Sequence, residues 1–180
     1  SGFDLGGAIR LISGRSTVFG HVDSVDEASL SALAVNLGRS RSGTAGVSSV
    51  LADVSTRPGG IVVVEAEKVE AAAKSRLLHL ADDAARSVAP EVRQVTAGYG
   101  ESNQRVWIAG SQGFFAADDR ARVMLSVTVM AQRDGIIQTG HDTLAHHGGF
   151  ELLTEEAVVK LAQKAARRAL VLLDGRPAPT

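Results

Sequence analysis

The sequence contains no cysteine, few aromatic residues and almost no net charge. Without cysteine the chain forms no disulfide, no thiolate metal site and no thiol nucleophile. The sequence therefore does not indicate whether the protein resides in an oxidising or a reducing compartment. Because aromatic residues make up only 4%, the core must be built mostly from valine, leucine, isoleucine and alanine. A net charge of −1 argues against a nucleic-acid-binding protein, which would need a clustered basic surface.

The sequence also lacks long apolar runs. None approaches the length that spans a bilayer, and no signal-peptide pattern opens the chain. We therefore expect a cytoplasmic protein that binds neither membrane nor nucleic acid. The chain starts at Ser1 rather than methionine and leads at once into a predicted strand, so we expect it to be part of something longer.

The 180 residues suffice for one domain or two small ones. Residues 1–40 predict a small hairpin–helix unit. Ala8–Ile12 and Ser16–Gly20 are short strand-like runs separated by a turn composition. A helix follows, for which Ser24 is the predicted N-cap and Glu27 completes a capping box.

Residues 41–60 have the composition of a loop or linker. Over residues 38–60 the chain holds five glycines and five serines, and it ends in Pro58-Gly59-Gly60. We expect a boundary here, with a central subdomain over 61–176. Residues 177–180 would then lead out to a further domain.

The central subdomain begins with a predicted short strand, Ile61–Val64, and a long helix, Glu65–Val88, which Pro90 ends. Its apolar stripe steps by three and four and consists of Val69, Ala73, Leu77, Leu80, Ala84 and Val88. A second long helix, Glu155–Asp174, is capped by Thr154. Its predicted apolar face consists of Val158, Leu161, Ala165, Ala169 and Leu172.

Between the two helices the sequence predicts an antiparallel block. In Arg120–Gln132 the residues Val123, Leu125, Val127 and Val129 alternate with others and share one face. Asp134-Gly135 predicts a tight turn into a strand at Ile136–Leu144. The other predicted strands are Glu91–Tyr99, Gln104–Ala109 and Gly113–Ala117.

The predicted fold class is therefore α+β. An antiparallel meander of about four or five strands carries two long helices on one face, and the hairpin–helix unit precedes it. We expect both helices to bury their stripes on the Val123–Val129 face, which leaves the other face or an edge of the sheet available.

Three histidines, His141, His146 and His147, are the weak candidates for a metal site or a general base. Their spacing does not fit a helical zinc motif, which places two histidines one turn apart with a glutamate between them. Flanking glycines favour a flexible surface loop with exposed or structural histidines instead. The site prediction is therefore no catalytic, cofactor-binding or metal-binding residue.

Asp118-Asp119 could form a pair of carboxylates for acid–base work or for a hard cation. Adjacent residues on a strand point to opposite faces, so we favour a turn between Ala117 and Arg120. A nucleophile elbow, a P-loop and a dinucleotide-binding fingerprint are all missing from the sequence.

The order of several weak motifs resembles the front part of the TldD/PmbA family. The similar segments, which cover nearly the whole chain, are Gly7–Gly14, Thr17–Gly20, the helix at Asp26–Leu37, Val92–Ala97, Ala116–Arg120 with Val123–Val129, Gly148–Glu151 and Leu173–Pro179. The set looks closer to the TldD branch than to the PmbA (TldE) branch. Val18-Phe19-Gly20-His21 departs from the usual Gly-Phe-Ala run.

The resemblance implies a zinc metallopeptidase that acts on extended or unfolded peptides. The family, which is also called modulator of DNA gyrase, uses a metal motif of the type His-Glu-x-x-x-His, and no His-Glu pair occurs in this chain. We therefore expect a wall of the peptide channel and part of a dimer, with a PmbA-type partner or with itself. Zinc and catalysis would come from a missing domain. The alternative is a free-standing, non-catalytic binding or scaffold domain.

Overall fold

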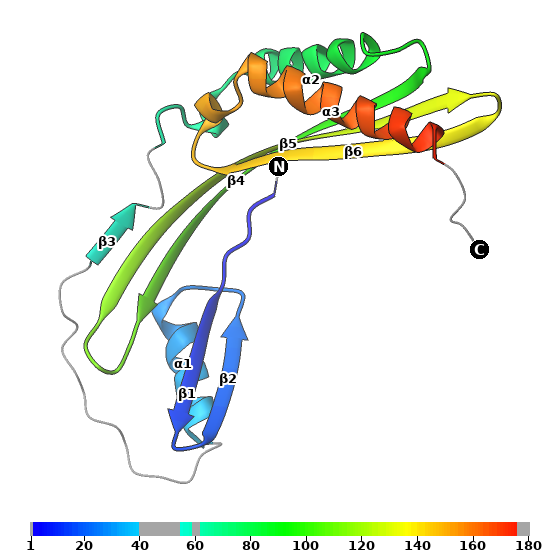
Figure 1. Cartoon of the computed structure of the whole chain (residues 1–180). Helices are drawn as coiled ribbons and strands as arrows, with labels where there is room; N and C mark the ends of the chain where they lie inside the picture. The colour runs from blue at the N-terminus through cyan, green and yellow to red at the C-terminus, as the bar shows by residue number, and fades with distance from the viewer. Residues whose placement is uncertain (1, 40–54, 59–61, 176–180) are drawn as a thin grey trace, which may run out of the picture. The chain divides into compact units, whose positions relative to one another are not determined.

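The computed structural model describes residues 2–39, 55–58 and 62–175. The chain divides into two compact units, residues 1–48 and 49–180 (Figure 1). We describe each unit by itself. Among the described residues, no helix is long and apolar enough to cross a membrane.

The first unit is the predicted hairpin with a helix. Strands β1 (Gly7–Ser13) and β2 (Ser16–Val22) pair antiparallel, and α1 (Glu27–Arg39) packs on them. The helix approaches so closely that a Cβ on Gly20 would lie 2.7 Å from the Leu33 side chain. Glycine therefore suits this contact.

The cap of α1 differs from the prediction. Asp26 accepts the backbone N–H of Ser29 at 2.8 Å, so Asp26 and not Ser24 caps the helix. Ser24 instead donates its hydroxyl to Asp26. These hydrogen bonds, with that of Ser24 as the largest cause, lower the pKa of Asp26 to about 2.

The second unit is a sheet of three long antiparallel strands with one short parallel strand. Its strands are β3 (Ser55–Pro58), β4 (Val92–Ala109), β5 (Phe115–Arg133) and β6 (Ile136–His147). β5 lies between β4 on one side and both β3 and β6 on the other. The predicted turn at Asp134-Gly135 is confirmed, with φ of 50° and 82° at the two residues.

Four local predictions about strands are wrong. Glu91–Tyr99 and Gln104–Ala109 belong to one continuous strand, β4, and Asp118-Asp119 lies inside β5 rather than in a turn. Residues 62–64 of the predicted first strand are not in a strand. In the predicted linker, residues 55–58 form β3, while the residues from 41 to 54 and 59 to 60 lie outside the described part.

Two long helices cover one face of this sheet (Figure 1). They are α2 (Ala71–Arg86) and α3 (Glu155–Leu173), each preceded by a short 3₁₀ helix, η1 (Ala66–Lys68) and η2 (Phe150–Leu152). α2 begins six residues later than predicted, since the chain first makes the separate turn of η1. The predicted cap of α3 is confirmed: Thr154 Oγ1 accepts from Ala157 N at 3.3 Å.

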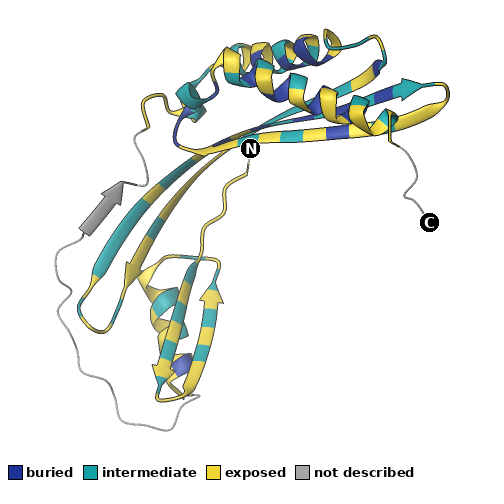
Figure 2. Ribbon diagram, viewed as in Figure 1, coloured by how far each residue is buried: buried dark blue, intermediate teal, exposed yellow. Residues whose placement is uncertain are grey.

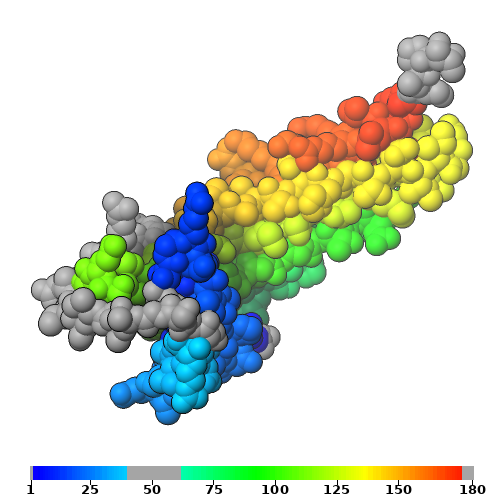
Figure 3. Space-filling view, turned by 90° about the horizontal axis from the view of Figure 1, so that it is seen from below, coloured from blue at the N-terminus to red at the C-terminus, as the bar shows by residue number. Residues whose placement is uncertain are grey.

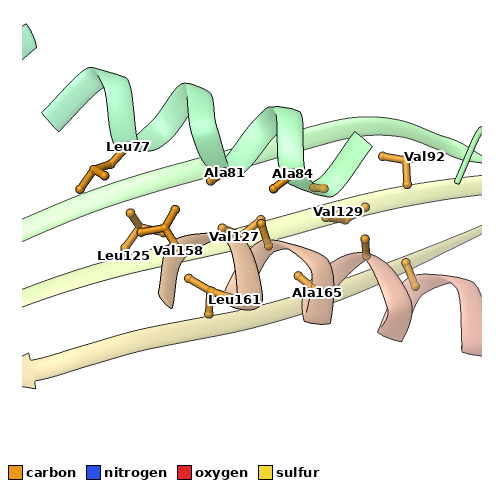
Figure 4. Close-up of a cluster of buried hydrophobic side chains, with 14 of the residues drawn as sticks. Leu77, Ala81, Ala84, Val92, Leu125, Val127, Val129, Val158, Leu161 and Ala165 are labelled. Carbon is orange, nitrogen blue, oxygen red and sulfur yellow. The ribbon is translucent and has the colours of Figure 1, made fainter. Parts of the chain in front are cut away.

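The core lies between these helices and β5, as the alternation predicted. Leu77, Ala81 and Ala84 of α2 and Val158, Leu161 and Ala165 of α3 point toward Leu125, Val127 and Val129 (Figure 4). Buried positions follow the inner sides of both helices and the sheet beneath them (Figure 2). Leu172 departs from its predicted role, because half of its surface is exposed.

The observed class is α+β, as predicted: two helices on one face of an antiparallel sheet, preceded by a small hairpin with a helix. The face away from the helices and the outer edges of the sheet carry the remaining surface.

Candidate functional site

The outer edge of β6 is the first candidate, because within the described residues β6 pairs only with β5. In an antiparallel pair, alternate residues direct their N–H and C=O groups to the same side. The carbonyl of His141 accepts from Arg168 Nη1 of α3 at 2.5 Å, so it faces away from β5. Thr139 and Thr143, two residues on either side, therefore present their backbone groups at this same edge.

Helix α3 lies directly alongside β6 (Figure 3, orange to red beside yellow). The close approach depends on Gly140, where an added Cβ would lie 2.1 Å from the backbone oxygen of Ala165. The predicted strand Ile136–Leu144 is confirmed as part of β6, which continues to His147. The flexible loop that the flanking glycines favoured is therefore wrong, and Gly140 is the contact with α3.

Asp142 of β6 forms ion pairs with α3. Its carboxylate lies 2.9 Å from Arg168 Nη1 and 3.1 Å from Lys164 Nζ, and its side chain is only 15% exposed. Burial raises the pKa of Asp142, but the hydrogen bond from Lys164 and the charges of Arg168 and Lys164 outweigh it and lower the pKa overall. The carboxylate is therefore ionised at neutral pH.

A groove of about 420 Å³ runs between this edge and the outer side of α3. Its lining includes Gly140, Lys164, Arg167, Arg168, Val171 and Leu172. Three cations thus stand beside two exposed aliphatic side chains. Arg167 contacts the side-chain oxygen of Gln163 at 3.3 Å and makes no ion pair within the described part of the chain.

The three histidines lie on β6 but do not converge. His141 faces Thr128 across the sheet, and its ring nitrogens lie 3.0 Å from Thr128 Oγ1 and 2.9 Å from Thr143 Oγ1. His146 and His147 are adjacent on the strand and point to opposite faces. His147 shares the face of His141 but follows it by six residues, which is about 20 Å along a strand.

A zinc ion, which the resemblance implies, does not fit these residues. Three ligands must reach one metal at about 2 Å, and the strand geometry holds the three histidines apart. Among the described residues, no group of three histidine, aspartate or glutamate side chains could hold a metal. We therefore derive no chemical step through zinc in this chain.

Asp118 and Asp119 are both ion-paired on β5. Asp118 lies 2.6 Å from Arg120 Nε, and Asp119 lies 2.9 Å from Arg105 Nε of β4. Each carboxylate has its own arginine, so the two do not form the paired site that the sequence suggested as an alternative. One of these ion pairs lies along β5 and the other crosses from β5 to β4.

A cluster that sequence reasoning missed joins α2 to β4. Lys74 lies 2.9 Å from Glu101 and its ammonium group stands 5.5 Å from the centre of the Tyr99 ring. The Tyr99 hydroxyl donates to Glu101 at 2.5 Å, and burial, followed by this bond, raises the pKa of Tyr99. The phenol therefore stays protonated. No sequence signal links a helix residue to a strand residue 27 positions later.

Comparisons with known proteins agree with this fold. Residues 64–173 match the family model of the PmbA/TldA metallopeptidase central domain. The Metalloprotease TldD homolog of Haemophilus influenzae is 28% identical over an alignment of 191 residues. The alignment covers 98% of this chain and 38% of that protein.

Two crystal structures, each named as a modulator of DNA gyrase, share the fold. The protein from Thermotoga maritima gives a TM-score of 0.69 at 16% identity, and the match covers 97% of this chain and 39% of that one. The protein from Bacteroides thetaiotaomicron gives a TM-score of 0.66 at 15% identity, and the match covers 91% of this chain and 38% of that one. The chain thus spans less than half the length of these relatives. By the match over residues 64–173, this chain belongs to the PmbA/TldD metallopeptidase family and contains its central domain.

Proposed function

We propose that this chain forms a wall of the peptide-substrate channel of a TldD-like metallopeptidase and binds extended peptides along a sheet edge. The observation that carries the proposal is the outer edge of β6, with which no further strand pairs among the described residues, in a chain of a metallopeptidase family. An extended peptide that pairs with such an edge is held by its main chain, so many sequences can bind.

In this proposal, catalysis is supplied elsewhere in the parent protein. The chain corresponds to 38% of the length of a relative that is named a metalloprotease, and its own described residues bring no metal ligands together. Zinc and the water that it activates would then belong to a separate catalytic domain. The proposal includes a cytoplasmic location.

The test compares this chain with a longer protein in which the catalytic domain proposed here follows it. We expect both to bind a fluorescent, unstructured peptide, and only the longer protein to cleave it in a reaction that a zinc chelator stops. Proteolysis by this chain alone that a chelator abolishes would contradict the division of roles. Failure of both proteins to bind any extended peptide would contradict the proposal that this chain forms a wall of the peptide channel.

Assembly is the second part of the proposal. At the β4–β5 hairpin end, Trp107, Ile108 and Phe114 each expose at least half of their surface. Exposed large apolar side chains of this kind are typical of contacts with another protein. We propose that they contribute to a dimer, with a second copy or with a PmbA-type partner.

Light scattering of the wild-type chain and of a Trp107→Ser, Phe114→Ser variant tests this contact. We expect the variant to be monomeric at concentrations where the wild type associates, either with itself or with added partner. A matched variant at the other hairpin of the sheet, Ile136→Ser with Ile137→Ser, should keep its association, since those exposed residues lie at the β5–β6 turn. Equal association of both variants would reject the proposed contact.

A further inference from the structure

We propose that the groove between the outer edge of β6 and α3 selects extended peptides that carry an acidic residue and, two positions away, an aliphatic one. This inference rests on the proposed function and adds which edge binds and which side chains it prefers. The partner is a protein segment without secondary structure, held as an added strand.

The backbone of β6 supplies the first part of the site. Thr139 and Thr143 are exposed, and their outward N–H and C=O groups lie on either side of His141. At His141 the carbonyl is already bonded to Arg168. A peptide strand therefore pairs on both sides of this point, where it meets the guanidinium group of Arg168 rather than a vacant acceptor.

The charge at this point supplies the preference for an acid. Lys164, Arg167 and Arg168 line the groove, and Asp142 is the one carboxylate that pairs with any of them in the described part of the chain. The three cations thus exceed the local negative charge by two. A carboxylate of the peptide would compensate this excess, and the bidentate geometry of an arginine suits it.

The aliphatic residues supply the second preference. Val171 is 69% exposed and Leu172 is 50% exposed, both on α3 and both beside the groove. Along a strand, side chains two apart lie on one face and are separated by about 6.6 Å. An aliphatic residue two positions from the acidic one can therefore cover Val171 and Leu172 while the acid meets the arginines.

The experiment measures fluorescence anisotropy of labelled peptides with the full 180-residue chain. Three peptides of equal length carry the same aliphatic residues and differ in one position, which is glutamate, glutamine or lysine. We expect the glutamate peptide to bind most tightly, the lysine peptide most weakly, and the difference to shrink at high salt. Equal binding of all three would overturn the acidic preference.

Two pairs of variants locate the site. Arg167→Glu should weaken binding of the glutamate peptide about fivefold, which is the effect expected from one exposed charge pair. Arg76→Glu, on the exposed surface of α2, should leave that binding unchanged. Thr139→Pro removes an outward N–H from β6 and should weaken the binding of every peptide. Asn103→Pro removes an outward N–H from β4 and should leave peptide binding unchanged. Circular dichroism confirms that each variant is folded.

The outcomes separate this inference from the proposed function. If Asn103→Pro abolishes binding and Thr139→Pro does not, the inference fails while edge binding holds, because the site is on β4. If Thr139→Pro weakens binding but Arg167→Glu has no effect, the edge is correct and the selected chemistry is wrong. If no peptide binds to the wild type, both fail.

Discussion

Single residues decide how closely the helices approach the sheet. Gly140 is the clearest case, because the backbone of α3 occupies the space that a Cβ would need. A glycine in a strand is normally unfavourable for stability, since it loses more conformational freedom on folding than other residues. Here the cost is offset by the contact that brings Lys164 and Arg168 to Asp142.

The variant Gly140→Ala should therefore lower the free energy of unfolding by about 1–3 kcal/mol, the usual effect of overpacking a tight contact. Gly100→Ala is the matched control on β4, where a Cβ would lie 3.7 Å from Met124 Cε, an ordinary contact. Urea unfolding followed by circular dichroism measures both. Equal stability of the two variants would contradict the close packing of α3 on β6.

The carboxylate of Asp142 makes a pH-dependent contribution. Its folded-state pKa is lowered from 3.8, so the stabilisation is fully present above pH 3.8 and is lost as the pH falls through the lower, folded-state pKa. We expect Asp142→Asn to be less stable than the wild type at pH 7, with a smaller difference at pH 3. Urea titrations at both values measure this, and a difference independent of pH would exclude an ionic role.

At the scale of elements, β5 organises the second unit because its two faces differ. Leu125 is fully buried beneath the helices, while its neighbour Met124 is 44% exposed on the opposite face. Burying a leucine side chain contributes about 1.5–3 kcal/mol, and the contribution grows where the surroundings cannot collapse into the space that truncation leaves.

Leu125→Ala should accordingly cost about 2–5 kcal/mol of stability. Met124→Ala, one position away, should cost less than about 1 kcal/mol, because it removes a side chain that is largely in water. Thermal unfolding of the two variants gives the comparison. A larger loss for Met124→Ala would mean that the face away from the helices is the buried one.

At the scale of the whole molecule, the two compact units should unfold separately. The first unit has few residues and, among those described, only Leu37 counts as a buried core residue, so it is expected to be the less stable. Calorimetry should resolve two transitions. Asp26→Ala, which removes the cap of α1, should lower the midpoint temperature only of the transition of the first unit. Leu125→Ala should lower the midpoint temperature only of the transition of the second unit.

A single cooperative transition that both substitutions shift equally would contradict this independence. The experiment uses the complete chain, so neither unit needs to be isolated. It also separates local from general effects, because each substitution serves as the control for the other.

The sequence by itself determined the α+β class, the two helices and the buried face of β5, because periods of 2 and 3.6 in apolar residues report which side of an element leaves water. It did not determine that β4 and β5 run unbroken through Gly100 and Asp118-Asp119. Those residues favour turns locally, but pairing along the whole ribbon overrides that preference.

Only the tertiary structure brought together the groove for which we propose peptide binding. The groove joins Gly140 of β6 to Arg167 and Leu172 of α3, and its charge excess depends on which cations Asp142 reaches. Such contacts join residues more than twenty positions apart in the sequence, which no local pattern encodes. Leu172 shows the limit: helical spacing placed it on the apolar face, but it is 50% exposed, whereas the next residue, Leu173, packs against the core.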